Sequence, residues 1–103
     1  MATLMLMHWP GVTRDQYEAV RGIAKWDTEQ PDGAKLHLAG FDADGAHITD
    51  VWESQEHFDR WMGARLGAAI QEVGIEGQPD VRFVPLAGVY APVFSREGQT
   101  ETI

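Results

Sequence analysis

The chain has 103 residues, the size of a single domain, and 44% of them are hydrophobic, which is enough material for a folded core. Lys and Arg number 8 against 16 Asp and Glu, and the net charge of −8 argues against nucleic acid or an anionic membrane surface as the main partner. Cysteine is absent, which excludes disulfides and thiolate chemistry and favours a reducing, cytoplasmic location. The apolar start, Leu4 to Met7, is too short for a membrane span and lacks a basic leader, so we expect no targeting segment.

The N-terminal part of the chain predicts a strand followed by a helix. Residues Thr3 to His8 form a short apolar run that ends at the turn formers Trp9-Pro10-Gly11. Thr13 and Gln16 have the spacing of a capping box, which predicts a helix from about Arg14 to Lys25. One stripe of this helix holds Tyr17, Val20, Ile23 and Ala24.

A β-hairpin is expected next. Lys35 to Gly40 and Ala46 to Glu53 have strand character, and residues 41–45 between them are rich in turn formers. Alternation along the second strand places Ile48, Asp50 and Trp52 on one face and Thr49, Val51 and Glu53 on the other. The pattern leaves the register between the two strands open.

The last two elements are a long helix and an edge strand. Ser54 can cap a helix whose buried stripe runs almost unbroken at steps of three and four residues. The stripe contains Phe58, Trp61, Met62, Arg65, Leu66, Ala69, Ile70 and Val73. A strand from Val81 to Leu86 follows, and its Pro85 indicates a sheet edge or a bulge.

The element order β-α-β-β-α-β predicts a ferredoxin-like α+β fold, in which a four-stranded antiparallel sheet carries both helices on one face. We expect this domain to span residues 1–91 and a C-terminal extension to follow at 92–103. The first strand is apolar at successive positions, and so is the last, so both faces of the sheet need cover. A second copy of the chain would cover the face without helices, which predicts a sheet-to-sheet homodimer.

The sequence resembles the dimeric α+β barrel proteins, and within them the antibiotic biosynthesis monooxygenase-like group. The resemblance lies in Asp50-Val51-Trp52-Glu53-Ser54, in Phe58 and Trp61, and in the strand from Lys35 to Gly40, and it covers roughly residues 2–91. It implies a small aromatic or polycyclic substrate bound between sheet and helices, with Trp52 lining the pocket. Members of the group include oxygenases, heme-degrading enzymes, isomerases and cyclases, so the resemblance indicates a fold more narrowly than a reaction.

Two features that the resemblance calls for are missing, an asparagine in the pocket and a histidine well along the second helix. The best-known cofactor-free oxygenases and the heme-degrading members use a pocket asparagine, and the heme enzymes add a ligand histidine well along the second helix. This chain has no asparagine, and its last histidine is His57 in the first turn of that helix. We therefore expect neither a heme cofactor nor the full set of hydrogen bonds of the quinone-forming enzymes.

His37 is the candidate acid or base, because a histidine in an otherwise apolar strand needs a hydrogen-bond partner and titrates near neutral pH. It could equally be a structural residue that is satisfied by a backbone carbonyl or lies at the dimer seam. Asp50 on the neighbouring strand could orient the imidazole, as carboxylates do in catalytic triads. Alternatively, Asp50 pairs with Lys35 or an arginine.

The candidate substrate-binding residues are mostly aromatic. Trp52 is a candidate through the resemblance, while Tyr17 offers a hydroxyl and Trp26 a large apolar surface near opposite ends of the first helix. His8 could reach the pocket mouth or be a solvated strand end. Arg65, inside the apolar stripe, either extends to solvent or answers an acidic group such as an anionic substrate.

Metal and nucleotide sites are not expected. The 4 histidines lack the spacings of metal ligands. His47 follows the hairpin turn and His57 lies at a helix start, so both are interpreted as surface residues. No glycine-rich phosphate loop or nucleophile elbow is present, and we expect no bound cofactor.

The sequence favours a cofactor-independent enzyme that performs proton-transfer chemistry (monooxygenation, isomerisation or cyclisation) on a small apolar compound, aromatic or polyketide-like, with His37 as acid or base. The alternative is a homodimer that binds a small molecule or serves a structural role without catalysis.

Overall fold

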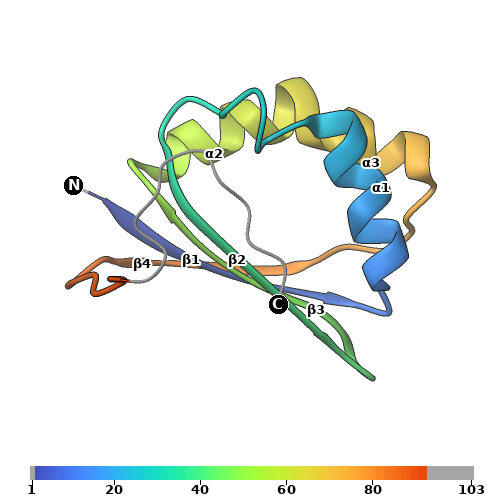
Figure 1. Ribbon diagram of the computed structural model, residues 1–103, viewed down its shortest axis with the longest axis horizontal. Coiled ribbons are helices and arrows are strands. Elements are labelled where there is room, and N and C mark those ends of the chain that lie inside the picture. The colour runs from blue at the N-terminus through green and yellow to red at the C-terminus, as the bar shows by residue number, and fades with distance from the viewer. Residues whose placement is uncertain (1, 93–103) are drawn as a thin grey trace.

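The structure, a computed structural model, describes residues 2–92 and has the predicted element order (Figure 1). Four strands form one sheet, namely β1 (Thr3–Pro10), β2 (Ala34–Asp42), β3 (Gly45–Trp52) and β4 (Asp80–Pro85). Helix α1 (Arg14–Ala24) joins β1 to β2, and the run α2 (Gln55–Trp61), η1 (Met62–Leu66) and α3 (Gly67–Val73) joins β3 to β4. Residue 92 apart, the expected C-terminal extension lies outside the described residues.

The strands are ordered β2-β3-β1-β4, and all neighbours are antiparallel. This arrangement confirms the ferredoxin-like α+β fold and places β4 at an edge, where Pro85 is tolerated because no ladder hydrogen bond is lost on the open side. Strands β1 and β2 are longer than expected, since Trp9 and Pro10 of β1, and Phe41 and Asp42 of β2, still pair with Ala46 and Gly45 of β3.

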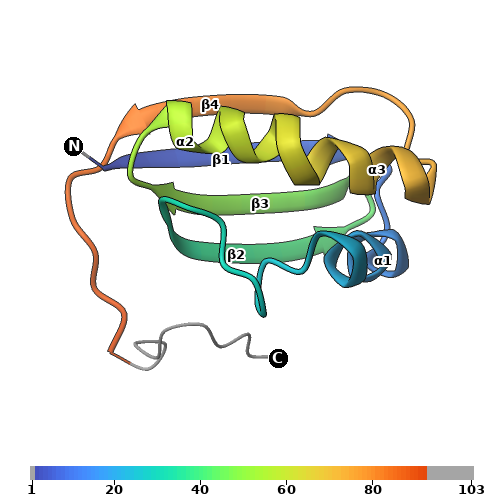
Figure 2. The ribbon, with the colours of Figure 1, turned by 90° about the horizontal axis from the view of Figure 1, so that it is seen from above.

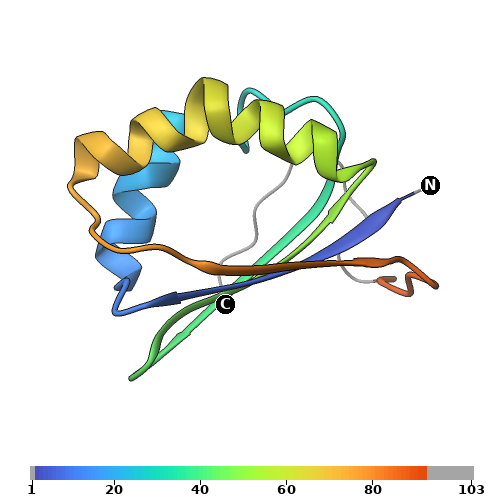
Figure 3. The ribbon, with the colours of Figure 1, turned by 180° about the vertical axis from the view of Figure 1, so that it is seen from behind.

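Both helical segments cover the same face of the sheet, and the opposite face carries no helix (Figures 1 and 3). Seen from above, the run from α2 to α3 is continuous and lies roughly along the direction of the strands, with α1 beside its α3 end (Figure 2). The core lies between these layers and is built from alternate residues of β1 and from the inner sides of the helices. Its buried members are Met5, Met7, Trp9, Val12, Val20, Ala24, Ala46, Trp52, Phe58, Leu66 and Ala69.

Helix α1 begins with the predicted capping box. The Thr13 hydroxyl accepts a hydrogen bond from the Gln16 backbone N–H at 3.2 Å, and the Gln16 side chain accepts one from the Thr13 N–H at 3.0 Å. Val20 and Ala24 are buried as expected, but Ile23 is 42% exposed, because the helix presents a narrower stripe to the sheet than its sequence suggests.

The second helix is not a regular α-helix throughout, which corrects the prediction of an unbroken α-helical stripe. Residues Met62–Leu66 form a π-helical turn, in which the Gly67 N–H donates to the Met62 carbonyl. A Cβ on Gly67 would lie 2.8 Å from that carbonyl oxygen, so the absence of a side chain at this position allows the close approach. The turn shifts the helical phase between Trp61 and Leu66, and both side chains reach the same cavity.

The face of the sheet without helices is largely apolar at its centre. The register places Thr49 between Leu6 and Leu38, and Val51 between Leu4 and Leu36, on this face. Leu38 is 47% exposed. Val51 is 4% exposed, so the exposed apolar surface of this face centres on Leu38.

Candidate functional site

A chain of three hydrogen bonds joins four side chains on the helix-covered face of the sheet. The Tyr17 hydroxyl lies 2.6 Å from His37 Nε2, and His37 Nδ1 lies 2.7 Å from Asp50 Oδ1. The Trp52 indole N–H donates to the other oxygen of the same carboxylate, Oδ2, at 3.0 Å. We call these four residues the Tyr–His–Asp–Trp chain.

The pairing of β2 with β3 decides that His37 meets Asp50, because their Cα atoms are direct partners in the antiparallel ladder. The register shifts between Ala34 and Leu36, so that Lys35 is an extra residue in β2. This bulge lets Ala34 pair with Trp52 while His37, three residues later, still faces the helices. The question left open by the sequence is thereby settled, and Asp50 pairs with His37 rather than with Lys35 or an arginine.

Asp50 is 4% exposed, and its charge is stabilised by hydrogen bonds to both carboxylate oxygens. A buried carboxylate without such partners would be strongly destabilising. Because a carboxylate can only accept, His37 Nδ1 carries the proton in this pair. In a neutral imidazole Nε2 then has the free lone pair, and the Tyr17 hydroxyl donates to it.

Tyr17 remains protonated in this environment. Burial raises the pKa of its phenol well above the ordinary value of 10.0, and the negative charges of Glu18 and Asp50 raise it further. The phenol is therefore a hydrogen-bond donor that can pass on its proton, not a resident base. The arrangement of an oriented imidazole beside a hydroxyl is the geometry of general acid–base catalysis.

Tyr17, His37 and Asp50 of the Tyr–His–Asp–Trp chain border a cavity of about 60 Å³ between the sheet and the helices. Trp52 does not line it, which corrects the pocket-lining role that the resemblance implied, because its side chain is buried in the core behind Asp50. Most of the wall is apolar or aromatic, and Trp26 and Trp61 belong to it together with Tyr17 and His37. The Trp26 ring lies 5.1 Å from the His37 ring and 5.3 Å from the Tyr17 ring, measured between centroids. The cavity has room for a few heavy atoms and is smaller than the pockets of about 300 Å³ or more that hold drug-sized ligands.

Four of the predicted site residues, in addition to His37, thus come together: Tyr17, Trp26, Asp50 and Trp52. Trp61, which its helical spacing assigned to the core, is also part of the cavity wall. The sequence signal for Trp61 was its place in an apolar stripe, and that signal does not separate a core residue from a pocket residue. The side chain of Met62 does not line the cavity.

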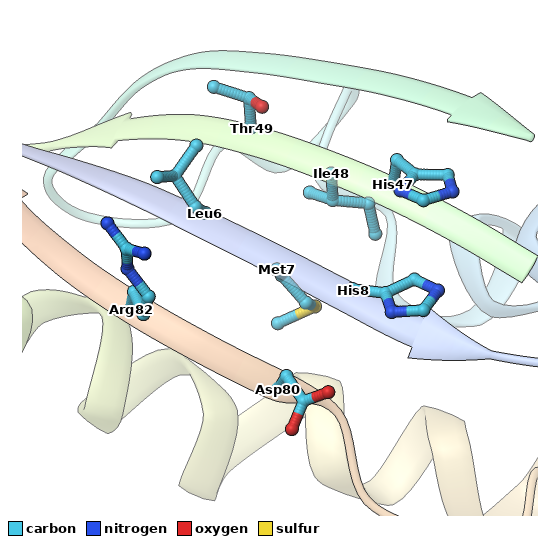
Figure 4. A pocket seen from close by; sticks show the side chains of 8 residues that line it. All are labelled: Leu6, Met7, His8, His47, Ile48, Thr49, Asp80 and Arg82. Carbon is cyan, nitrogen blue, oxygen red and sulfur yellow. The ribbon is translucent and has the colours of Figure 1, made fainter.

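His8 is not near this cavity, which corrects its expected place at the pocket mouth. It lies on the opposite face of the sheet, where its ring stacks on that of His47 at a centroid distance of 4.6 Å (Figure 4). The two rings border a hollow of about 290 Å³, to which Asp80 and Arg82 of β4 also contribute. His47 binds Asp42 at 2.9 Å, and this hydrogen bond lowers the pKa of the Asp42 carboxyl.

The sequence predicted that Arg65 extends to solvent or binds an acidic group. In the structure it binds backbone carbonyls instead. Its guanidinium donates to the carbonyl oxygen of Ala24, the last residue of α1, and to that of Glu29 at 2.8 Å. A cation at the C-terminus of a helix is favourable there because it complements the free carbonyls. Arg65 therefore connects η1 to the end of α1 and to the segment after it.

His57 is less exposed than expected, with 20% of its side chain accessible. Its Nδ1 lies 2.6 Å from the hydroxyl of Ser54, which caps α2 as predicted, and its Nε2 lies 3.3 Å from Glu53. Within residues 2–92, no three His, Asp or Glu side chains converge in a way that would hold a metal ion. None of the helices in the same range combines the length and apolar character needed to cross a bilayer.

The protein thus has an α+β fold in which the Tyr–His–Asp–Trp chain lies beside a cavity between the sheet and the helices. Comparison with solved structures identifies the fold as that of the antibiotic biosynthesis monooxygenase-like proteins, which confirms the resemblance seen in the sequence at the level of the fold. Neither the family models nor the sequences of the curated proteins give a match.

Three of the similar structures illustrate the likeness. A monooxygenase from the gene ActVA-Orf6 of Streptomyces coelicolor, in complex with the ligand nanaomycin D, has a TM-score of 0.55 at 19% identity, covering 88% of this chain and 91% of its own. SnoaB, a cofactor-independent oxygenase from Streptomyces nogalater, has 0.54 at 14%, covering 85% and 94%. A protein of unknown function from Nitrosomonas europaea has 0.61 at 13%, covering 88% and 93%.

Proposed function

We propose that this protein is a cofactor-independent enzyme that removes or relays a proton on a small apolar compound, aromatic or polyketide-like, bound between sheet and helices. The observation that carries the proposal is the Tyr–His–Asp–Trp chain, in which a half-buried imidazole is oriented between a carboxylate and the hydroxyl of Tyr17, and the side chains of His37 and Tyr17 line the cavity. The likeness in fold to a cofactor-independent oxygenase and to a monooxygenase that binds nanaomycin D supports the class of ligand and of reaction.

The hydrogen bonds define the path of the proton. A donor group of the ligand that meets Tyr17 Oη passes its proton to that oxygen while the Tyr17 proton moves to His37 Nε2. The resulting imidazolium is stabilised by Asp50, whose other oxygen remains bound to Trp52. The ligand is left as an anion, which is the common first intermediate of an isomerisation, a cyclisation or an attack on dioxygen.

A second candidate is a small-molecule-binding or structural protein without catalysis. The cavity volume of about 60 Å³ supports it, because a polycyclic ligand would enter only if wall residues moved. In that case the Tyr–His–Asp–Trp chain would serve only to satisfy buried polar groups. Catalytic turnover distinguishes the two candidates.

The proposed assembly is a homodimer formed by the faces without helices. The central apolar residues of this face would be covered by the same residues of a second copy, as a two-fold interface requires. Arg82 and Asp80 on the edge strand offer charges of both signs for pairing across such an interface. The absence of cysteine supports a cytoplasmic location for this dimer.

The test of catalysis uses polycyclic phenols and aryl ketones in deuterated buffer, with deuterium uptake followed by NMR and oxygen consumption by an electrode. For a compound that is turned over, His37→Gln should lower kcat by about 100-fold or more, since general acid–base catalysis contributes on that order. Tyr17→Phe should act in the same direction because it breaks the path at Oη.

The matched control is His47→Gln, the same substitution at a histidine that is 49% exposed on the other face of the sheet. This variant should keep the wild-type kcat. Unchanged turnover in His37→Gln would exclude the acid–base role. Binding of these compounds without any turnover would favour the second candidate.

A further inference from the structure

Trp52 is the one member of the Tyr–His–Asp–Trp chain that the proposed proton path does not use. Its side chain is 2% exposed and does not line the cavity, so it has no contact with a ligand bound there. Its indole N–H nevertheless donates at 3.0 Å to Asp50 Oδ2, the carboxylate oxygen that His37 leaves free. A hydrogen bond to a charged group is about twice as strong as one between neutral groups, so this contact bears directly on the carboxylate.

Two donors together fix the plane of the Asp50 carboxylate. His37 Nδ1 lies 2.7 Å from Oδ1, and the Trp52 indole donates to Oδ2. The hydrogen bonds formed among residues 2–92 include no third one to this side chain. Without the indole, only the bond to His37 would orient the carboxylate, and the terminal torsion of an aspartate is soft.

The indole ring itself is held firmly. Trp52 lies two residues after Asp50 on β3, so both side chains are on the same face of the sheet, and β3 is paired with a strand on either side. The ring packs edge to face on Phe58 with the centroids 5.4 Å apart, and it lies 5.5 Å from the ring of Trp61. The donor therefore reaches Asp50 from a fixed position.

His37 is less constrained by packing than the residues that hold it. It lies on the edge strand β2, and 29% of its side chain is exposed. The orientation of its ring thus depends on its hydrogen bonds to Asp50 and Tyr17. The partner at one ring nitrogen decides which nitrogen carries the proton, and a base that accepts from Tyr17 needs Nε2 without a proton.

We infer that Trp52 is a positioning residue, whose indole N–H orients Asp50 so that Asp50 holds the His37 proton on Nδ1. The inference rests on the proposed function, because this tautomer leaves Nε2 free to take the Tyr17 proton. Removing the indole N–H lets the carboxylate turn, and part of the His37 population then carries its proton on Nε2. Trp52 thus acts on the reaction through Asp50, without touching the ligand.

The test measures the tautomer of His37 in the protein without ligand. Two-bond ¹H–¹⁵N correlations, recorded on ¹⁵N-labelled protein at a pH of about 8 where imidazole is neutral, distinguish a protonated ring nitrogen from an unprotonated one. The His37→Gln variant assigns the resonances. The wild type should carry the His37 proton on Nδ1 alone. In Trp52→Phe, the Nδ1 and Nε2 resonances should move toward each other, as in a mixture of tautomers.

A second variant separates the N–H group from the volume of the ring. Trp52→Phe also removes atoms from the core, which lowers stability. Trp52→3-benzothienylalanine keeps two fused rings and has a sulfur atom in place of the N–H group, so it should fold normally and still give the mixture of tautomers. A single Nδ1 tautomer in this variant would overturn the inference.

The matched control is Trp9→Phe, the same substitution at another tryptophan of the core. The Trp9 indole donates to the backbone carbonyl of Glu76 at 3.5 Å and has no bond to Asp50. This variant should keep the His37 proton on Nδ1. An equal mixture of tautomers in Trp9→Phe and Trp52→Phe would show that any loosening of the core has this effect, and the role of the Trp52 N–H would be wrong.

Kinetics provide the second readout. For a compound that is turned over, Trp52→3-benzothienylalanine should lower kcat by about 10- to 100-fold, the usual effect of removing a residue that orients a functional group. KM should stay unchanged, because Trp52 does not line the cavity. A raised KM at unchanged kcat would show that Trp52 contacts the ligand and would overturn the inference.

The two readouts separate the inference from the proposed function. The tautomer of His37 is measured without turnover of any compound. If turnover proves independent of His37 while the Trp52 variants still change its tautomer, the proposed acid–base function fails and the control of His37 by Trp52 stands.

Discussion

At the scale of the residue, Asp50 is the position on which the polar cluster depends. It is 4% exposed and accepts hydrogen bonds from His37 and from Trp52 through different oxygens. The substitution Asp50→Asn removes the charge and keeps the shape of the side chain. It replaces one carboxylate oxygen by an NH₂ group, which then faces the N–H of His37 or of Trp52. The buried donors would then be left unsatisfied, and that penalty falls on the folded state.

Asp50→Asn is therefore expected to lower the free energy of unfolding by about 1–3 kcal/mol. The measurement is urea denaturation followed by tryptophan fluorescence. Asp59→Asn, the same change at an exposed position of α2, is the control and should leave the midpoint unchanged. A wild-type midpoint for Asp50→Asn would mean that the hydrogen bonds of this carboxylate do not stabilise the fold.

Tyr17 allows a direct test of burial through its ionisation. The chain has 2 tyrosines, so a Tyr90→Phe variant leaves Tyr17 as the only phenol. Because burial raises the pKa of Tyr17 in the folded state, the stability from its neutral form is fully present below about pH 10 and is lost as the pH rises through the folded-state pKa.

In an alkaline titration of that variant, tyrosinate absorbance near 295 nm should thus appear well above pH 10 and together with unfolding. Circular dichroism recorded on the same samples identifies the unfolding step. Ionisation near pH 10 in a protein that remains folded would contradict the buried, donating phenol.

At the scale of the element, the π-helical turn is the least expected feature and the one that shapes the cavity. It lies between Trp61 and Leu66, both of which line the cavity wall, and it carries Arg65, which binds the end of α1. A regular α-helix through this segment would change the direction of these side chains relative to one another. The turn therefore couples the second helix to the position of Trp26.

Two glycine substitutions in this helix should have opposite effects. Gly67→Ala places a Cβ 2.8 Å from the Met62 carbonyl oxygen and should lower the melting temperature, since the π-helical turn must shift to accommodate it. Gly63→Ala meets nothing within 4 Å and should leave the melting temperature equal or higher, because alanine favours helix. Differential scanning fluorimetry measures both, and a stabilising Gly67→Ala would count against the π-helical turn.

At the scale of the whole molecule, the two faces of the sheet have different environments. One packs against the helices and encloses the Tyr–His–Asp–Trp chain, while the other presents apolar residues without cover from any helix (Figure 3). Apolar side chains that gather on a face without helices, with Leu38 exposed among them, are typical of an interaction site. The proposed homodimer follows from this asymmetry.

Leu38→Glu should convert the dimer into a monomer, because it places a charge in the middle of the proposed interface at a position that is already 47% exposed in the single chain. Sedimentation velocity at micromolar concentration is the measurement. Ala39→Glu on the opposite side of the same strand is the control and should remain dimeric. A monomeric wild-type protein, or a dimeric Leu38→Glu variant, would contradict the proposed interface.

Much of the fold could be predicted from local signals in the sequence. The capping box at Thr13, the cap at Ser54 and the assignment of Ile48, Asp50 and Trp52 to one face of β3 each depend on residues close together in the chain, and each is confirmed. Individual residues of the candidate site, His37 and Asp50 among them, could also be named, because polar groups in apolar strands need partners wherever the chain folds.

What only the tertiary structure decided is how these residues meet. The bulge at Lys35 sets the register that joins His37 to Asp50, and the packing of α1 on the sheet adds Tyr17. Likewise, the places of His8 on the far face and of Arg65 at the end of α1 depend on partners that are distant in sequence. The composition and period of a segment determine its secondary structure, whereas register and packing follow from contacts between segments, which no local pattern contains.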